Sequence, residues 1–216
     1  MSRILVIGTG NKHKVEEIAP LLLESGMPLE LKTADSYGPF SPEETGGNLE
    51  ENALIKARAA MNMSGEWALA DDTGLFVDAL DGRPGIYAAR YAGEGCSFAD
   101  NIRKLLGEME GIPHHKRTAT FRCAIALCRP GHEPRIFRGE CMGWIKESPS
   151  GVGGFGYDPV FVVGELSKTF AELTAIEKNK VSHRSIAVNL CRLELDTLLK
   201  CSTHSAQTLS PLTPHP

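Results

Sequence analysis

The chain has 216 residues, 42% of them apolar, a length that predicts one large domain or one domain in two lobes. Its 23 Lys and Arg residues against 27 Asp and Glu residues leave a net charge of -4. That charge excludes a general nucleic-acid coat and a polybasic membrane binder, because both need a surplus of cations. Any anionic ligand must therefore be met by a local cluster of positive charge.

The first half of the chain predicts a strand, two helices and a second strand. Residues 4–7 are a continuous apolar run, typical of a strand that is buried on both faces. Asn11 is a candidate N-cap for the helix that follows. A polar, glycine-rich stretch over residues 36–48 precedes a helix over residues 49–64, and residues 67–70 predict the next strand.

The second half predicts more strands and two more helices. Residues 97–100 resemble a capping box at the start of a helix. Residues 118–127 and 135–145 are rich in β-branched and aromatic side chains, and the Pro-Gly turn between them predicts an antiparallel pair in a mixed sheet. Residues 157–163 predict a further strand, and residues 183–200 a C-terminal helix.

Three further features bear on domain organisation and location. The six cysteines include no C-x-x-C pair, so we expect reduced, mostly buried thiols. No apolar run reaches the ~18 residues of a membrane span, and the N-terminus lacks a signal-peptide core, so we expect a soluble, cytoplasmic protein without membrane contacts. Residues 202–216 contain no charged residue other than histidine, which predicts a disordered tail after one domain over residues 1–201.

Two loops are candidates for binding an anion and a planar ring. The segment 9–14, T-G-N-K-H-K, joins a strand to a helix N-terminus and carries Lys12 and Lys14, which suits a phosphate chain. It is neither a Walker A loop nor a dinucleotide fingerprint, and an ordinary capped turn is the alternative. The glycine loop 151–159 carries Phe155, which can stack on a base or merely anchor the loop to the core.

Acidic residues predict a metal site. Asp71 and Asp72 follow directly after the strand over residues 67–70, and Glu43 and Glu44 lie upstream. Carboxylates at the carboxyl end of a strand in an α/β sheet suit Mg²⁺, which takes one or two carboxylates together with substrate phosphates. Neighbours on a strand point to opposite sides, so only one of the two aspartates is expected to face the site. Paired acids on a surface turn are the alternative.

A basic segment lies at the start of the last predicted helix. Residues 177–184 carry Lys178, Lys180 and Arg184, and His183 beside them. His183 has no metal-ligand partner four residues on, so we do not interpret it as a metal ligand. His183 and Arg184 can instead donate to acceptor atoms of a base, and a solvated helix start is the alternative.

Together these segments resemble the Ham1/RdgB family of inosine triphosphate pyrophosphatases over about residues 4 to 200. The matching motifs are T-G-N-x-x-K at 9–14, E-E-T-G at 43–46, E-N-A-x-x-K-A at 51–57, D-D-[ST]-G-L at 71–75, P-G-I-Y-[AS]-A-R-Y at 84–91, G-G-F-G-Y-D-P at 153–159 and S-H-R at 182–184. Seven matches in order make a chance likeness very improbable.

The resemblance implies a fold, a reaction and a catalytic centre. The fold would be α/β, a single domain with a long mixed β-sheet in two lobes around a central cleft. The reaction would convert a non-canonical purine nucleoside triphosphate such as ITP, dITP, XTP or dXTP to the monophosphate and pyrophosphate, with Mg²⁺ as cofactor, in a homodimer. Asp72 would bind metal and act as general base, and Glu44 would be the second metal ligand.

The resemblance also implies a set of substrate-binding residues: Thr9, Gly10, Asn11, Lys14, Lys56, Thr73, Phe155, Gly156, Tyr157, Asp158, Lys178, His183 and Arg184. Three lysines of this set would hold the triphosphate and nucleotide. The residues from Phe155 to Asp158, with His183 and Arg184, would select a base with an acceptor oxygen at C6. Thr73 stands where many relatives have Ser and keeps the hydroxyl.

Two other functions remain open. A Maf-type pyrophosphatase specific for pyrimidine nucleotides would share the fold and the reaction, but the F-G-Y-D and S-H-R matches favour the purine branch. A non-catalytic purine nucleotide sensor would keep the cations and Phe155 without needing Glu44 and Asp72. Since both acids are present, the sequence favours the enzyme.

Overall fold

The structure is a computed structural model and describes residues 2–24 and 26–207, with the backbone alone for residues 201–207. The described residues form an eight-stranded sheet and five α-helices. The strands are β1 (Arg3–Ile7), β2 (Leu29–Thr33), β3 (Trp67–Val77), β4 (Pro84–Gly85), β5 (Thr118–Cys128), β6 (Arg135–Ile145), β7 (Phe161–Val163) and β8 (Lys168–Thr169). The helices are α1 (Lys12–Leu23), α2 (Leu49–Ser64), α3 (Phe98–Glu108), α4 (Ala175–Val181) and α5 (His183–Gln207).

The sheet is mixed, as predicted. Its order is β2-β1-β3-β5-β6-β7-β8, and β4 pairs with β3 beside that path. β1 runs parallel to β2 and β3, while the β3–β5, β5–β6, β6–β7 and β7–β8 pairs are antiparallel. The predicted hairpin between β5 and β6 is confirmed, with residues 118–127 paired to residues 135–144.

The helices begin where the sequence supplies caps. The Asn11 side chain accepts a hydrogen bond from the His13 amide at 3.0 Å and starts α1. The Asn48 side chain does the same for Glu51 at the start of α2. The capping box predicted at residues 97–100 is present at the start of α3. These local signals fix the residues at which α1, α2 and α3 begin.

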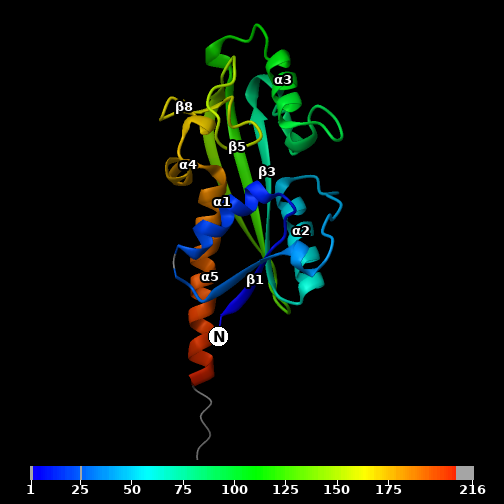
Figure 1. The fold of residues 1–216 in the computed structure, drawn as a ribbon, viewed down its shortest axis with the longest axis vertical. Coiled ribbons are helices and arrows are strands. Elements are labelled where there is room, and N and C mark those ends of the chain that lie inside the picture. Colours follow the sequence, from blue (N-terminus) through cyan, green and yellow to red (C-terminus); the bar gives the residue numbers. More distant parts are fainter. Residues whose placement is uncertain (1, 25, 208–216) are drawn as a thin grey trace, which may run out of the picture.

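Two lobes share the sheet, which confirms the predicted fold class. In the α1 lobe, α2 covers one face of β3 and β5, and α1 and α5 cover the opposite face (Figure 1). The α3 lobe contains α3, α4, β7 and β8. It also contains the C-terminal ends of β3 and β6 and the N-terminal end of β5. β3, β5 and β6 each have 11 residues. β3 and β5 contribute buried side chains to the cores of both lobes, whereas β6 contributes buried side chains to the α3 lobe and the partly buried Ile136 and Phe137 to the α1 lobe.

Several predicted boundaries were wrong. β3 does not end at residue 70 but continues to Val77, so Asp71 and Asp72 lie within the strand, held there by pairing with β5. The strand predicted over residues 157–163 begins only at Phe161, because turns precede it. Residues 177–181 belong to a separate helix, α4, and extended backbone at Ser182 divides α4 from α5.

The C-terminal helix α5 runs to Gln207, beyond the predicted end at residue 200. Residues 208–216 of the predicted tail lie outside the described residues, so the disorder expected there stays a prediction. None of the described helices combines the length and apolarity needed to cross a membrane. The described cysteine side chains are free thiols: Cys123, Cys128, Cys141 and Cys191 are buried and Cys96 is half-buried.

Candidate active site

Along one edge of β3, a short stretch is paired with neither β1 nor β4. β1 pairs with β3 as far as Leu69, and β4 pairs with Leu75 and Phe76. Residues 71–73 lie between these two pairings, where the two lobes meet; we call this part of the molecule the waist. A cavity of about 360 Å³ opens here and draws its walls from both lobes. The end of β1 therefore makes room for a ligand against the middle of β3.

Every catalytic, metal-binding and substrate-binding residue that the family resemblance implies lines this one cavity. Its walls include Thr9, Gly10, Asn11, Lys14, Glu44, Lys56, Asp72, Thr73, Phe155, Gly156, Tyr157, Asp158, Lys178, His183 and Arg184. The sequence analysis gave no role to other lining residues, among them Phe40, Ile86, Arg90, Phe98 and Phe121. Asp71 and Glu43 are not among the lining residues, in keeping with the expectation that only one of the adjacent aspartates faces the site.

Lys56 joins the two predicted metal-binding acids. Its Nζ lies 2.7 Å from Glu44 Oε1 and 2.8 Å from Asp72 Oδ1. Burial raises the pKa of Asp72 above its usual value, and Lys56 opposes part of that rise. Burial alone would lower the pKa of Lys56, but the carboxylates around it raise that pKa instead. Lys56 therefore stays charged, and a carboxylate oxygen of Glu44 and one of Asp72 both contact its ammonium group.

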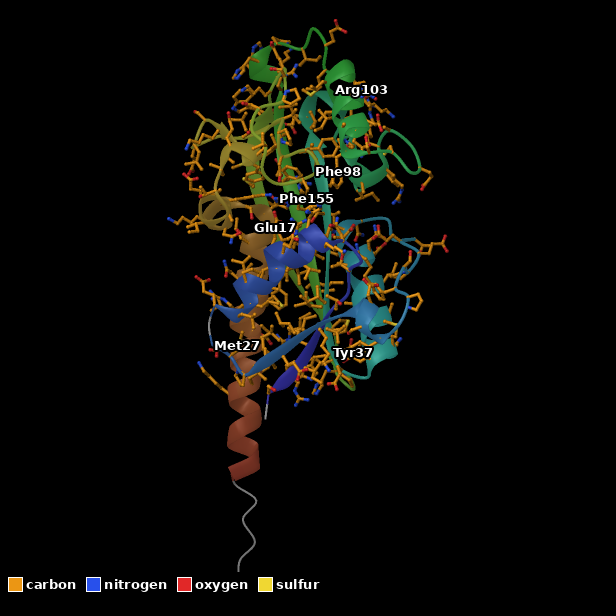
Figure 2. All side chains as sticks on the ribbon, viewed as in Figure 1. Glu17, Met27, Tyr37, Phe98, Arg103 and Phe155 are labelled. Carbon is orange, nitrogen blue, oxygen red and sulfur yellow. The ribbon has the colours of Figure 1, made fainter. Side chains whose placement is uncertain are left out.

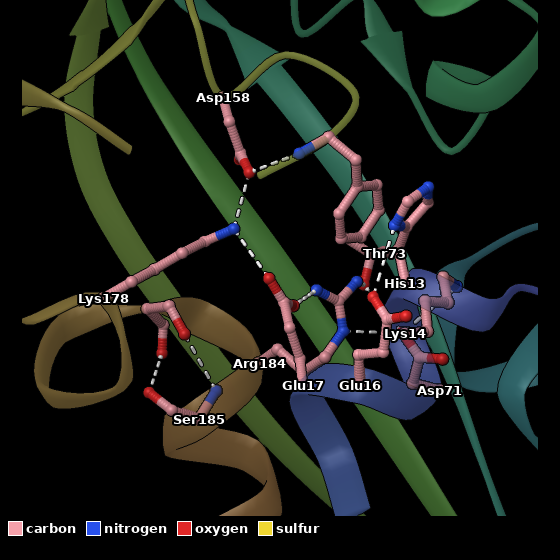
Figure 3. Close-up of polar contacts among 12 residues, drawn as sticks. His13, Lys14, Glu16, Glu17, Asp71, Thr73, Asp158, Lys178, Arg184 and Ser185 are labelled. Carbon is pink, nitrogen blue, oxygen red and sulfur yellow. Dashed lines mark hydrogen bonds and ion pairs between the residues drawn. The ribbon is translucent and has the colours of Figure 1, made fainter. Parts of the chain in front are cut away.

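Asp71 organises a second set of cations on the other face of β3 (Figure 3). Its Oδ2 lies 3.1 Å from Lys14 Nζ and 3.2 Å from Arg184 Nε. Although burial favours a raised pKa, Lys14 and Arg184 hold the pKa of Asp71 well below its usual range. The Thr73 hydroxyl donates to the same oxygen and accepts from Arg184 Nη2 at 3.1 Å. This network fixes Arg184 against the strand.

Glu17 of α1 bridges two cations that come from α4 and α5. It pairs with Lys178 at 2.7 Å and with Nη1 of Arg184. Burial would raise the pKa of Glu17, but Arg184 and Lys178 lower it, so Glu17 is ionised. The guanidinium of Arg184 thus uses three of its five N–H groups on Asp71, Glu17 and Thr73. Two N–H groups remain for a ligand.

The glycine loop is held by Asp158. Asp158 Oδ2 accepts from the Phe155 amide at 2.9 Å and from Lys178 Nζ at 2.6 Å. Gly154 has a φ of +68°, and a Cβ there would lie 1.9 Å from Asp158 Oδ2, so only glycine fits. The Tyr157 hydroxyl donates to the Ala88 carbonyl at 2.9 Å, which ties the loop to the segment that follows β4.

Three aromatic rings meet at the cavity. Phe155 stacks on His13 with ring centroids 5.2 Å apart, and Phe98 lies 6.0 Å from Phe155 in a tilted arrangement. Figure 2 shows Phe98 and Phe155 side by side at the waist, with Glu17 below them. Phe155 also lies within 5.5 Å of the guanidinium of Arg184. A planar ligand is therefore offered an aromatic wall next to cations.

His183 presents two unpaired ring nitrogens in the cavity wall. It is 3% exposed and lines the cavity, yet among the described residues neither ring nitrogen finds a hydrogen-bond partner. Its ring stacks on Phe121 with centroids 4.6 Å apart. Burial, assisted by Arg184 and Lys178, lowers the pKa of His183 well below 6.5. A neutral imidazole offers one donor and one acceptor, and both are free for a ligand.

The charges of the site decide whether a metal fits. The cations Lys14, Lys56, Lys178 and Arg184 each contact at least one of the carboxylates Glu17, Glu44, Asp71, Asp72 and Asp158. Arg90 lines the cavity as well, so five cations stand against five carboxylates and leave no net positive charge for an anionic ligand. The described residues hold no group of three or more His, Cys, Asp and Glu side chains suited to a metal. Two convergent carboxylates fit Mg²⁺, whose other ligands would be phosphate and water.

The sequence analysis missed Glu17 and Asn52. Neither lines the cavity, but Glu17 contacts Lys178 and Arg184, and Asn52 contacts Asp72. Glu17 lies three residues after Lys14 in α1, and Asn52 lies four residues before Lys56 in α2. These spacings place each on the same helix face as its predicted neighbour. Asn52 also lies in the E-N-A-x-x-K-A motif at 51–57, where the sequence analysis gave it no role. Their partners come from distant segments, which no local pattern identifies.

Comparisons with known proteins agree with one another. A model of the Ham1 family matches residues 5–192. A Geobacter sulfurreducens protein named dITP/XTP pyrophosphatase is 52% identical over 189 residues, covering 87% of this chain and 94% of that protein. A solved structure of a Staphylococcus aureus Ham1 protein has a TM-score of 0.81 and 38% identity, covering 91% of this chain and 100% of its own. A HAM1 protein from Coxiella burnetii has a TM-score of 0.82 and 37% identity, covering 90% and 99%.

Proposed function

The chain belongs to the Ham1 family, and on that premise we propose that it hydrolyses non-canonical purine nucleoside triphosphates to the monophosphate and pyrophosphate. Its relatives at about half identity are named dITP/XTP pyrophosphatases. The observation that carries the proposal is the convergence of Glu44 and Asp72 on one point of a cavity where His183 has no partner. The substrates are ITP, dITP, XTP and dXTP.

Glu44 and Asp72 would hold Mg²⁺, as their convergence and the lack of surplus positive charge in the site support. Bound there, Mg²⁺ would supply charge for the phosphate oxygens and acidify a water molecule. Asp72 accepts the proton of the attacking water on its carboxylate.

The attack falls on the α-phosphorus, so pyrophosphate leaves as a unit. Lys14 and Lys56 lie on either side of β3 and hold the phosphate chain from both faces. At the N-terminus of α1, the Gly10 amide adds a backbone donor and the helix adds the positive end of its dipole, while the Thr9 and Asn11 amides donate within the loop. Lys178 reaches the cavity from α4, where Glu17 and Asp158 hold its ammonium group, and it binds the nucleotide there.

The base stacks on Phe155 and is selected by His183 and Arg184. Hypoxanthine and xanthine present an acceptor oxygen at C6, which the two remaining N–H groups of Arg184 and the donor nitrogen of His183 can meet. Adenine presents an amino group there and leaves those buried donors unpaired, an outcome that costs binding. Tyr157 and Asp158 shape the loop that carries Phe155.

The two alternatives are less well supported. A pyrimidine-specific Maf-type enzyme is not favoured, because the related proteins are named for purine substrates. A nucleotide sensor would not need two acids converging on Lys56.

We further propose a homodimer in the cytoplasm. Free thiols are in keeping with a reducing compartment. Ile186, Leu190 and Leu193 expose apolar side chains along one side of α5, a surface suited to a second subunit. Light scattering of the purified protein tests the oligomeric state.

A substrate panel tests the proposed reaction. The purified protein is incubated with Mg²⁺ and each of ITP, dITP, XTP, ATP, GTP, CTP and UTP, and pyrophosphate release is measured. We expect the inosine and xanthosine nucleotides to be hydrolysed far faster than ATP, because adenine lacks the C6 oxygen. Guanine carries that oxygen, so GTP measures selection by contacts other than those at C6. In ¹⁸O-labelled water, label in the monophosphate supports attack at the α-phosphorus. Label in inorganic phosphate, with IDP as co-product, contradicts it.

A further inference from the structure

Asn52 of α2 links the segments that carry the two proposed metal ligands. It is 1% exposed. Its Nδ2 donates to Asp72 Oδ2 at 3.3 Å, and its Oδ1 accepts from the Gly46 amide at 2.8 Å. Gly46 lies two residues after Glu44 in the loop before α2. The amide of Asn52 therefore spans from the strand that carries one acid to the loop that carries the other.

The orientation of this amide is fixed by its partners. The Gly46 N–H is a donor only, so the atom of Asn52 that faces it must be the oxygen, and the NH₂ group must face Asp72. The approach is close, because a Cβ on Gly46 would lie 2.6 Å from Asn52 Oδ1. The loop and the amide hold each other in place.

Asn52 and Lys56 act on the same two segments from one face of α2. They are four residues apart and so lie one turn from each other. Lys56 joins Asp72 Oδ1 to Glu44, while Asn52 joins Asp72 Oδ2 to the loop two residues beyond Glu44. Lys56 exchanges easily between anionic partners because it is a flexible point charge, whereas Asn52 is directional.

We propose that Asn52 is a positioning residue that sets the separation of Asp72 and Glu44 and thereby the affinity of the site for a divalent cation. This inference rests on the proposed function, in which these two acids bind the metal. Asn52 itself touches neither metal nor nucleotide. Removing its amide lets the loop and Asp72 move apart, and two carboxylates that no longer converge bind a divalent cation more weakly.

The test compares Asn52→Ser with Asn101→Ser. Asn101 is a matched control, since it is 2% exposed and its amide also bridges two groups. It accepts from the Ala92 amide and the Cys96 thiol and donates to the Ala89 carbonyl. Binding of Mn²⁺ alone is measured by electron paramagnetic resonance, next to melting temperature and the Mg²⁺ concentration that gives half-maximal ITP hydrolysis. We expect Asn52→Ser to weaken Mn²⁺ binding and to raise the half-saturating Mg²⁺ concentration by about 10-fold or more. KM for ITP at saturating Mg²⁺ stays near the wild-type value.

Asn101→Ser should lower the melting temperature without weakening Mn²⁺ binding. Equal Mn²⁺ affinity in wild type and Asn52→Ser overturns the proposal and leaves Asn52 a structural residue. If Asn52→Ser does not fold, Gly46→Ala displaces the same amide from its other end and must weaken Mn²⁺ binding likewise, or the proposal fails. Failure of the proposed function would show as no pyrophosphate released from ITP by the wild type. The Mn²⁺ titration needs no turnover, so it tests the role of Asn52 independently of that result.

Discussion

Asp71 and Asp72 are neighbours in sequence, but their carboxylates lie on opposite faces of β3 and hold different cations. Asp71 pairs with Lys14 and Arg184, on the side of α1 and α5. Asp72 pairs with Lys56, on the side of α2. Strand alternation thus separates a buried anchor from a carboxylate that faces the cavity. The two aspartates should respond differently to the same substitution.

Asp72→Asn should abolish most of the activity while the nucleotide still binds. The change keeps the size of the side chain but removes its charge and its basic oxygen. We expect kcat for ITP to fall at least ~10²–10⁴-fold, the usual contribution of a general base, with a further loss from weaker metal binding. Calorimetric titration with ITP checks that binding survives through the lysines and Phe155. A kcat within a few fold of wild type would remove Asp72 from the chemistry.

Asp71→Asn should act mainly on stability. The Asp71 side chain is fully buried, and its loss would leave Lys14 and Arg184 without their shared partner. Removing one member of a buried ion pair typically costs about 3–5 kcal/mol in the free energy of unfolding. Urea unfolding of Asp71→Asn and Asp72→Asn side by side tests this, and the larger loss is expected for Asp71→Asn. Equal losses would contradict the separate roles.

Arg184→Ala should reduce hydrolysis of ITP more than hydrolysis of ATP. A hydrogen bond from a charged donor to the C6 oxygen is worth about 1.5–3 kcal/mol, and ATP has no acceptor oxygen at C6. The measurement is kcat/KM for both substrates, at a temperature where circular dichroism shows the variant folded. That condition matters because Asp71 and Glu17 lose a partner as well. The same loss on both substrates would assign Arg184 to phosphate binding or to the fold.

The stability of the protein should fall as the pH drops below about 6.5, in part because of His183. Its pKa is lowered well below 6.5 in the folded protein, so the unfolded chain takes up a proton there that the folded protein does not. Stability from this group is therefore fully present above pH 6.5 and declines by ~1.4 kcal/mol per pH unit below it. Urea unfolding from pH 5 to 8 measures the difference between wild type and His183→Phe. A difference that does not change with pH would show that His183 titrates normally when folded.

Gly154→Ala should disorder the loop that carries Phe155. The new Cβ would meet Asp158 Oδ2 at 1.9 Å, and the φ of +68° adds backbone strain. We expect a rise in KM for ITP and weaker stacking of the base. Gly131→Ala is the control, because Gly131 has a φ of +74° in a turn remote from the site, with no atom within 4 Å of the added Cβ. An unchanged KM in Gly154→Ala would separate this loop from nucleotide binding.

Local signals in the sequence located most of the fold. Asn11 as an N-cap and the capping box of α3 are short-range patterns, and both are present in the structure. β2 was not predicted, since its sequence L-E-L-K-T has only two apolar residues and its pairing with β1 is long-range. The break at Ser182 between α4 and α5 has neither Gly nor Pro to mark it.

The site divides in the same way. The sequence motifs located every lining residue that the resemblance named, because each motif belongs to one segment. The pairing between segments was not predictable from the sequence. Glu17 binds Lys178 and Arg184 across more than 160 positions, and Asn52 binds Asp72 from another element. Such contacts depend on the tertiary arrangement, which periodicity and spacing do not encode.

The three long strands have a consequence for motion. β3, β5 and β6 pass unbroken from one lobe to the other, and all three pack side chains against the cores of both lobes, with those of β6 only partly buried in the α1 lobe. A hinge needs a few residues that are free to change their backbone angles, and paired residues in the middle of a sheet are not. We therefore expect no rigid-body swing of one lobe against the other. Adjustment to a nucleotide should fall to the glycine loop and to the segment that carries Glu44. Amide hydrogen exchange should accordingly be slowest in the middle of these strands, with both lobes unfolding as one cooperative unit.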